Sequence, residues 1–354
     1  MFLAWNEIQK NKLRFVLITG VLMLVAYLVF FLSGLATGLK DLNRESVDKW
    51  KASSIILTEE SDKSLYQSSM FIEQAEAVKA EEIAVIGQLS AIAGNGDHKT
   101  NVSLFGIRQD EFIMPEVTEG KPFVGMNEVI AANSLKEEGF SIGDELHLSS
   151  STEKLTIVGF TDKAWFNAAP VLYADLDTFH KAKYGEGAEA NNDRINGIVI
   201  RNGGDNVIQD DALQVIEIEE FIQNLPGYTE QNLTLTFMIY FLFAISAVIV
   251  AIFLYVLTVQ KISMFGVMKA QGISNYYLSK SVVAQTFLLA AIGVMIGLAL
   301  TLTTGAFLPA AVPVSFDLPT MLIYGAVLVV VAIAGAVFSV WTIVRVDPLK
   351  AIGG

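Results

Sequence analysis

The 354-residue sequence contains no cysteine and only three histidines. Without cysteine, no disulfide can stabilise the fold, so each domain must rely on its own apolar core, which suits a Gram-positive bacterial surface. His98, His147 and His180 are scattered without the spacing of metal ligands. We therefore predict no metal site and expect each histidine to lie at the surface.

Motifs of enzymatic chemistry are also missing. The sequence has no GxSxG nucleophile elbow. Residues 94–100, GNGDHKT, lack the GxxxxGK[ST] spacing of a phosphate-binding loop, and we predict that they form a turn between two strands. We therefore predict no catalytic residue, and energy for work across a membrane must come from another subunit or from an ion gradient.

Charge is absent from four long apolar runs, in a chain that is 53% hydrophobic with a mean hydropathy of +0.48. Each run reaches the length of roughly 20 residues that a membrane-spanning helix needs. The first run exceeds the apolar core of a signal peptide, so we expect it to be retained. The pattern predicts an α-helical membrane protein with four transmembrane helices, at residues 15–39, 233–258, 281–306 and 321–344.

The absence of charge within these runs also bears on the energy source. Carriers driven by an ion gradient usually keep ionisable groups inside their membrane helices. The four runs hold none. The sequence therefore favours energy supplied by a separate ATPase.

Acidic residues concentrate between the first two runs, where residues 41–230 hold 34 of the 37 acidic and 15 of the 24 basic side chains. The acidic surface disfavours nucleic acid as a partner. By the positive-inside rule, we expect a multi-pass cell-membrane protein with both termini cytoplasmic and the acidic region outside. This rests on basic residues at the same ends of the four runs: Lys10, Lys12, Arg14, Lys261, Lys269, Lys280, Arg345 and Lys350.

The acidic region is large enough for a core of its own, and we predict a large extracellular α/β domain over residues 53–227. Residues 40–52 predict a helical stalk that continues the first span, and residues 307–320 an outer loop. Short apolar segments predict strands at residues 53–57, 83–86, 102–107, 128–131, 155–160, 171–173 and 198–201. Helices are predicted at residues 67–79, 132–138, 175–183 and 217–224.

Three further segments complete the predicted organisation. Residues 1–14 place apolar side chains on one side of a helix, which indicates a cytoplasmic interfacial helix that anchors the chain. In the first span, Gly34 and Gly38 have the GxxxG spacing that allows close helix packing, within the chain or in a dimer. Residues 345–354 form a short cytoplasmic tail.

Residues 259–280 form a short polar and basic interruption between the second and third spans. We interpret them as a cytoplasmic coupling loop with a short helix that stops at Gly272 and receives force from another protein. The alternative is an ordinary basic connection without a partner.

These features resemble the FtsX-like and MacB-like permeases of ABC transporters, in which a short cytoplasmic loop docks on an ATPase. The outer-domain stretches NEVIAANSL, GDELHL and LTIVGF resemble the MacB-type core, and the ending RVDPLKAI matches a pattern of the family. The stretches AWNEIQKNKLR, FLSGLATGL and DPLKAIGG are most similar to Hrt-type haem-exporting permeases of Gram-positive bacteria. The loop motif QKxxxxGxxKAxG stands here as Gln260, Lys261, Gly266, Lys269, Ala270 and Gly272.

The resemblance implies the permease subunit of an ABC exporter that removes haem from the cell membrane. It implies a homodimer with two HrtA-like ATPase subunits that hold ATP and Mg²⁺, lipid as the surroundings, and haem as substrate without a permanently bound cofactor. Alternatives with the same topology export an antimicrobial peptide or a lipid, or act as an FtsX-like transducer that controls a cell-wall hydrolase.

A haem substrate would need an iron ligand in this chain. Cysteine is absent and no histidine lies in the spans, so the ligand is expected to be a tyrosine or a methionine. Aromatic faces would supply the remaining contacts. The candidate haem contacts are Met23, Tyr27, Trp165, Phe166, Tyr228 and Tyr240.

Overall fold

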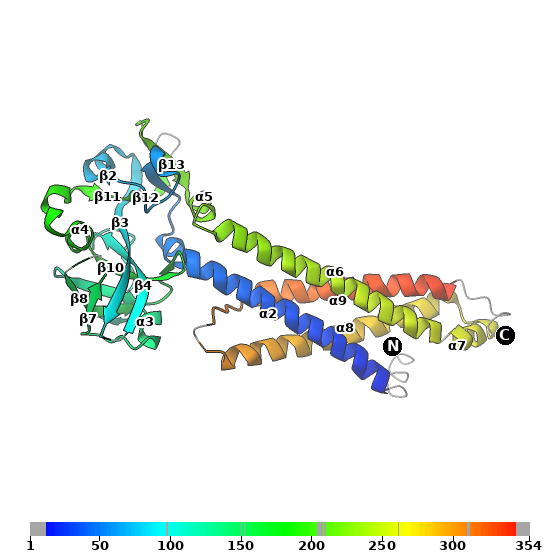
Figure 1. Cartoon of the computed structure of the whole chain (residues 1–354). Helices are drawn as coiled ribbons and strands as arrows, with labels where there is room; N and C mark the ends of the chain where they lie inside the picture. The colour runs from blue at the N-terminus through cyan, green and yellow to red at the C-terminus, as the bar shows by residue number, and fades with distance from the viewer. Residues whose placement is uncertain are drawn as a thin grey trace. The chain divides into compact units, whose positions relative to one another are not determined.

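The computed structural model describes residues 12–96, 98–149, 151, 153–203, 208, 210–260, 262–309 and 312–344. Of the expected interfacial helix only residues 12–14 are described, and the expected tail at residues 345–354 lies outside the described residues. The chain divides into a membrane unit, Met1–Gly38 with Asn232–Gly354, and an α/β unit, Leu39–Gln231 (Figure 1).

Four helices of the described chain are long and apolar enough to cross a membrane. A large α/β region lies between the first and the second, as the sequence predicts. The helices run further than the uncharged runs, and the first continues without a break through the residues expected to form a stalk. They are α2 (Lys12–Trp50), α6 (Tyr228–Gln260), α8 (Asn275–Phe307) and α9 (Leu318–Val344), with the short α7 (Ile262–Ala270) between α6 and α8.

The α/β unit is built on an 11-stranded sheet. Nine of its strands follow the order β13-β1-β12-β3-β4-β10-β6-β8-β5. The other two pair off this path, β7 with β3 and β8, and β9 with β10. Its pairs are antiparallel except β10 with β4 and β6 with β8, which are parallel. The strands of this sheet are β1 (Ser54–Thr58), β3 (Ala80–Asn95), β4 (His98–Ile107), β5 (Glu119–Gly120), β6 (Glu128–Ala132), β7 (Glu145–Leu148), β8 (Lys154–Thr161), β9 (Trp165–Phe166), β10 (Ala169–Asp175), β12 (Gly197–Gly203) and β13 (Leu213–Glu217).

Three short helices, α3 (Ser134–Glu137), α4 (Leu176–Tyr184) and α5 (Ile218–Gln223), complete the unit, with a separate ladder of β2 (Met70–Phe71) and β11 (Arg194–Ile195). Each predicted strand segment overlaps an observed strand. Residues 94–100 join two strands as predicted, but the turn is shorter, because β3 and β4 form a hairpin in which Asn95 already pairs with His98.

Two sequence predictions are wrong here. Residues 67–79 do not form an α-helix but the strand β2 followed by a 3₁₀ helix, Ile72–Ala77. Met70 pairs with Ile195, so tertiary strand pairing overrides the local helical pattern. His180 is not a surface residue: it is 2% exposed, and its Nε2 lies 2.7 Å from the carbonyl oxygen of Arg194.

Helix α4 packs on the sheet through one aromatic side chain. Gly87 of β3 and Gly106 of β4 lie opposite each other in the ladder. A Cβ at either position would overlap the ring of Phe179, which is fully buried. The two glycines therefore leave the space that the Phe179 ring fills. Glycine occurs at these strand positions because α4 packs closely against them.

The last turns of α2 belong to the α/β unit rather than to a free stalk. Val47 and Trp50 are buried in its main apolar core. Arg201 of β12 donates two hydrogen bonds to the carbonyl oxygen of Trp50, at 2.9 and 2.6 Å, which satisfies an orphan acceptor at the end of the helix. Tyr173 of β10 donates to the hydroxyl of Ser46 at 3.2 Å. The last turns of α2, within the α/β unit, are therefore fixed to the sheet by packing and by polar contacts.

The carboxyl group of Glu111 makes the α/β unit sensitive to pH. Burial raises its pKa from 4.5 to about 7, although the amide of Val85 donates to it at 2.8 Å. The folded state binds the proton of Glu111 more tightly than the unfolded state does. The contribution of Glu111 to the stability of the folded state is therefore complete below pH 4.5 and is lost as the pH rises to 7. Because the carboxyl group is partly open to solvent, which weakens the effect, we expect the free energy of local unfolding around β3 to fall by about 2 kcal/mol across this window.

Hydrogen exchange of the β3 amides in the intact protein measures this effect as protection factors. The Glu111→Gln variant, which cannot ionise at this position, is expected to show protection that falls less between pH 4.5 and 7 than in the wild type. The matched control is Glu138→Gln, at an exposed carboxylate of the same unit, which retains the wild-type profile. Equal pH profiles for Glu111→Gln and the wild type would contradict the assignment.

Candidate functional site: coupling helix and membrane helices

Helix α7 ends as the glycine in the sequence predicts. Gly272 has φ +87°, a left-handed conformation that glycine adopts without strain. The amide of Ile273 donates to the carbonyl of Met268 at 3.0 Å, and that of Gly272 to Lys269 at 2.9 Å. These two bonds are the Schellman motif, which closes the helix end. Ser274 then begins α8, because its side chain accepts a hydrogen bond from the Tyr277 amide at 3.3 Å.

A small apolar core holds α7 against the start of α8. Phe265 and Leu278 are buried together, with Met268, Ile273 and Val282 packed around them. Two other apolar side chains of α7, Met264 and Val267, are 42% and 44% exposed. The short helix is therefore braced from behind and presents an exposed apolar face, defined by Met264, Val267 and Ala270.

The predicted coupling residues fall into different places on this helix. Gln260 and Ala270 are exposed, Lys269 is half-buried, and Gly266 is buried within α7. Gly272 is exposed at the helix end, and Lys261 lies outside the described residues. Sequence reasoning singled out motif positions and missed Val267 as part of the exposed face. The signal was available, because positions 264 and 267 lie one turn apart and are both apolar.

Helices α2 and α8 cross closely through a second pair of glycines, which sequence reasoning did not single out. A Cβ added at Gly293 would lie 2.8 Å from the Cβ of Leu22, and one at Gly297 would lie 2.8 Å from the Cβ of Ala26. Their GxxxG spacing allows the two backbones to approach. The hydroxyl of Tyr27 also donates to Thr304 at 3.4 Å.

The GxxxG pair predicted on α2 packs within the chain. A Cβ at Gly34 would lie 2.6 Å from the ring of Phe316, in the loop between α8 and α9, and one at Gly38 would overlap the carbonyl of Pro313. The amide of Ser315 donates to the carbonyl of Gly34 at 3.0 Å. The loop therefore occupies the surface that the glycines open.

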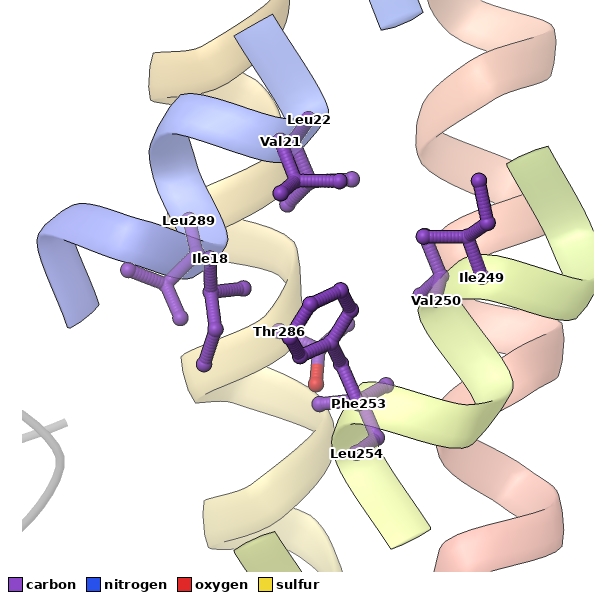
Figure 2. A pocket seen from close by; sticks show the side chains of 9 residues that line it. All are labelled: Ile18, Val21, Leu22, Ile249, Val250, Phe253, Leu254, Thr286 and Leu289. Atoms are coloured by element: carbon purple, nitrogen blue, oxygen red, sulfur yellow. The ribbon is translucent and has the colours of Figure 1, made fainter. Parts of the chain in front are cut away.

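Helices α2, α6 and α8 border a narrow apolar crevice (Figure 2). Its one polar lining residue, Thr286, donates its hydroxyl to the carbonyl of Val282 at 3.0 Å. The crevice thus offers a surface suited to apolar chains, with no side chain suited to bind iron. The lining residues are Ile18, Val21, Leu22, Ile249, Val250, Phe253, Leu254, Thr286 and Leu289.

The candidate haem contacts of the α/β unit are engaged in its fold. Phe166 is 4% exposed and packs edge-on against Phe105, with ring centroids 5.1 Å apart. Trp165 is half-buried. Tyr228 is 4% exposed, and its hydroxyl accepts a hydrogen bond from Arg44 at 3.3 Å. In this conformation, Phe166 and Tyr228 are not accessible to a ligand.

The candidate contacts of the membrane unit differ from one another in exposure. Met23 and Tyr27 are half-buried on α2, where Tyr27 stacks on Phe31. Tyr240 of α6 is 61% exposed. Among the six predicted haem contacts, Tyr240 therefore presents the most accessible phenol.

The described residues contain no cluster of three or more His, Cys, Asp or Glu side chains that could hold a metal ion.

Comparison with known proteins finds a family match in the C-terminal third of the chain. Residues 236–348 match the family described as FtsX-like permease C-terminal. This stretch holds most of α6 and the whole of α7, α8 and α9. Among solved structures, the extracellular domain of the noncanonic ABC-type transporter YknZ from Gram-positive bacteria is 14% identical, with a TM-score of 0.33, and covers 47% of this chain and 100% of that chain.

Curated relatives extend the similarity to the full length. A permease of Staphylococcus haemolyticus (strain JCSC1435), named HrtB and assigned provisionally to a hemin transport system, is 25% identical over 100% of this chain and 99% of that protein. An uncharacterized ABC transporter permease of Mycobacterium tuberculosis (strain ATCC 25618 / H37Rv) is 22% identical over the same shares. Residues 236–348 therefore match the FtsX-like permease family, and the full chain is similar to permeases of ABC transporters.

Proposed function

We propose that this chain is the permease subunit of an ABC exporter that removes haem from the cell membrane. The observation that carries the proposal is similarity along the entire chain to HrtB permeases, which are named for hemin transport. Two copies would act with two HrtA-like ATPase subunits, related by the two-fold symmetry that is commonest in oligomers.

Helix α7 supports the coupling part of the proposal. Its buried side packs against α8. Its exposed apolar face carries Met264 and Val267, whose side chains suit an apolar groove on a partner. By the positive-inside rule, Lys269 and Lys280 support a cytoplasmic location for this end of the helices and for both termini. Nucleotide-driven movement of the ATPase would reach α8 through the apolar core behind α7.

The membrane helices support an apolar substrate that enters from the lipid. Their described parts carry an exposed phenol at Tyr240 and an apolar crevice, and no charged metal site. Haem combines an apolar macrocycle with an iron that a phenolate can bind. An iron porphyrin dissolved in the membrane therefore fits this surface better than a polar solute does.

Haemin titration of the purified complex with its ATPase, in lipid nanodiscs, tests the proposal. We expect a saturable shift of the Soret absorption and stimulation of ATP hydrolysis over the same haemin concentrations. An iron-free porphyrin is the control, because it enters the bilayer but cannot take an axial ligand. A featureless titration without stimulation would favour export of a peptide or a lipid, or control of a cell-wall hydrolase.

A further inference from the structure

Helices α6 and α9 bring two tyrosines together on the membrane unit. The ring of Tyr324 on α9 packs edge-on against Phe243 of α6, with centroids 5.5 Å apart and planes at 78°. Tyr240 lies one turn before Phe243 on the same helix, so it lies near the side of α6 that Tyr324 contacts. Sequence reasoning considered Tyr240 alone, since no local pattern links it to a residue 84 positions away.

The two tyrosines lie at similar depth. Tyr240 is seven residues past Leu233, where the uncharged run of α6 begins, and Tyr324 is six residues past Leu318, where α9 begins. At 1.5 Å per residue, these separations correspond to about 10 Å and about 9 Å along the helices. Both phenols therefore lie about two turns inside the apolar parts of their helices.

The surroundings of Tyr240 are aromatic and accessible. Phe237 lies one turn before Tyr240 on α6 and is 57% exposed. Phe241 directly follows Tyr240 and is 66% exposed. Tyr324 is half-buried beside this face. A planar apolar ligand could thus lie against aromatic rings while its centre meets an exposed phenol.

We propose that Tyr240 and Tyr324 form a two-phenol site for a ferric porphyrin on the α6–α9 face, with Tyr240 as the axial ligand and Tyr324 as its positioning residue. The inference rests on the proposed function, and it names the site that would receive the substrate.

The ligand exchange balances without any further reagent. Ferric haem in contact with water carries hydroxide as an axial ligand. When the oxygen of Tyr240 binds the iron, the iron–hydroxide bond breaks, and the phenolic proton leaves with the hydroxide as water. Iron remains ferric throughout. A second phenol beside the bound phenolate can donate a hydrogen bond to it, which favours the charged form of the ligand.

Absorption and electron paramagnetic resonance spectra of haemin bound to the full-length complex test the site. We expect Tyr240→Phe to lose the charge-transfer bands of phenolate-ligated ferric haem. We expect Tyr324→Phe to retain bound haem but shift those bands and weaken affinity by about tenfold, the usual effect of removing a hydrogen bond to a ligand. The matched control is Tyr255→Phe, which removes a 53% exposed phenol nearer the other end of α6 and leaves the spectrum unchanged.

The outcomes separate this inference from the proposed function. If the wild type shows no saturable haemin binding, the proposed function fails and the site fails with it. If the wild type binds haemin and Tyr240→Phe keeps the phenolate spectrum, the site is wrong while haem transport stands. If Tyr324→Phe behaves as Tyr255→Phe does, the positioning role of Tyr324 is wrong.

Discussion

The Val267→Asp variant is expected to lose its ATPase while the permease itself still inserts and folds. Val267 is 44% exposed on the outer face of α7, away from the core of Phe265 and Leu278. Docking would bury the new carboxylate in an apolar contact without a partner. Such a group costs about 3 kcal/mol or more, which corresponds to at least ~100-fold weaker binding.

Co-purification of the tagged permease with its ATPase measures this loss, and haemin-stimulated ATP hydrolysis reports the functional consequence. The matched control is Val124→Asp, which places the same charge at a 75% exposed valine of the α/β unit and should leave co-purification unchanged. A Val267→Asp variant that retains its ATPase at wild-type stoichiometry would exclude the outer face of α7 as the docking surface.

Residues 259–280 show which parts of the site a sequence can supply. The helix stop at Gly272 was predictable because a left-handed residue at a helix end is a local requirement that glycine meets. The direction in which α7 faces was not predictable from the motif. The direction in which α7 faces depends on Leu278 and Val282 of α8, which follow the helix end at Gly272 and pack against Phe265.

The same division between local and non-local information applies to the fold. Segments such as residues 155–160 predicted strands because consecutive apolar residues fill the interior of a buried sheet. The helix predicted at residues 67–79 was wrong, because Met70 pairs with Ile195, which lies far away in the chain. Tyr324 was missed for that reason too, since its role depends on α6, which lies well before it in the sequence.

Gly34 and Gly38 illustrate a motif that predicts close approach without identifying the partner. The spacing requires only that something packs against bare backbone. In the structure, the loop between α8 and α9 fills this surface, with the Phe316 ring between Gly34 and Gly305. A second copy of α2 was an equally valid expectation from the sequence, because the loop lies far along the chain.

The Phe316 contact leads to a second large expected effect. Phe316→Ala removes a ring that touches both α2 and α8, and the cavity left behind should cost about 3 kcal/mol. Gly305→Ala adds a methyl group that would overlap the ring, with an expected cost of about 1–3 kcal/mol. Both variants should lower the temperature at which the detergent-solubilised protein loses its monodisperse elution profile.

The double variant distinguishes this packing from unrelated damage. With the ring gone, the methyl group added at position 305 has space, so Gly305→Ala should cost little in the Phe316→Ala background, and the two effects should not add. Gly20→Ala is the matched control on α2, because nothing lies within 4 Å of the added Cβ, and the higher helix propensity of alanine should leave stability unchanged or raised. Additive losses in the double variant would mean that Phe316 does not sit against Gly305, and the loop would then be free to leave the surface that Gly34 and Gly38 open.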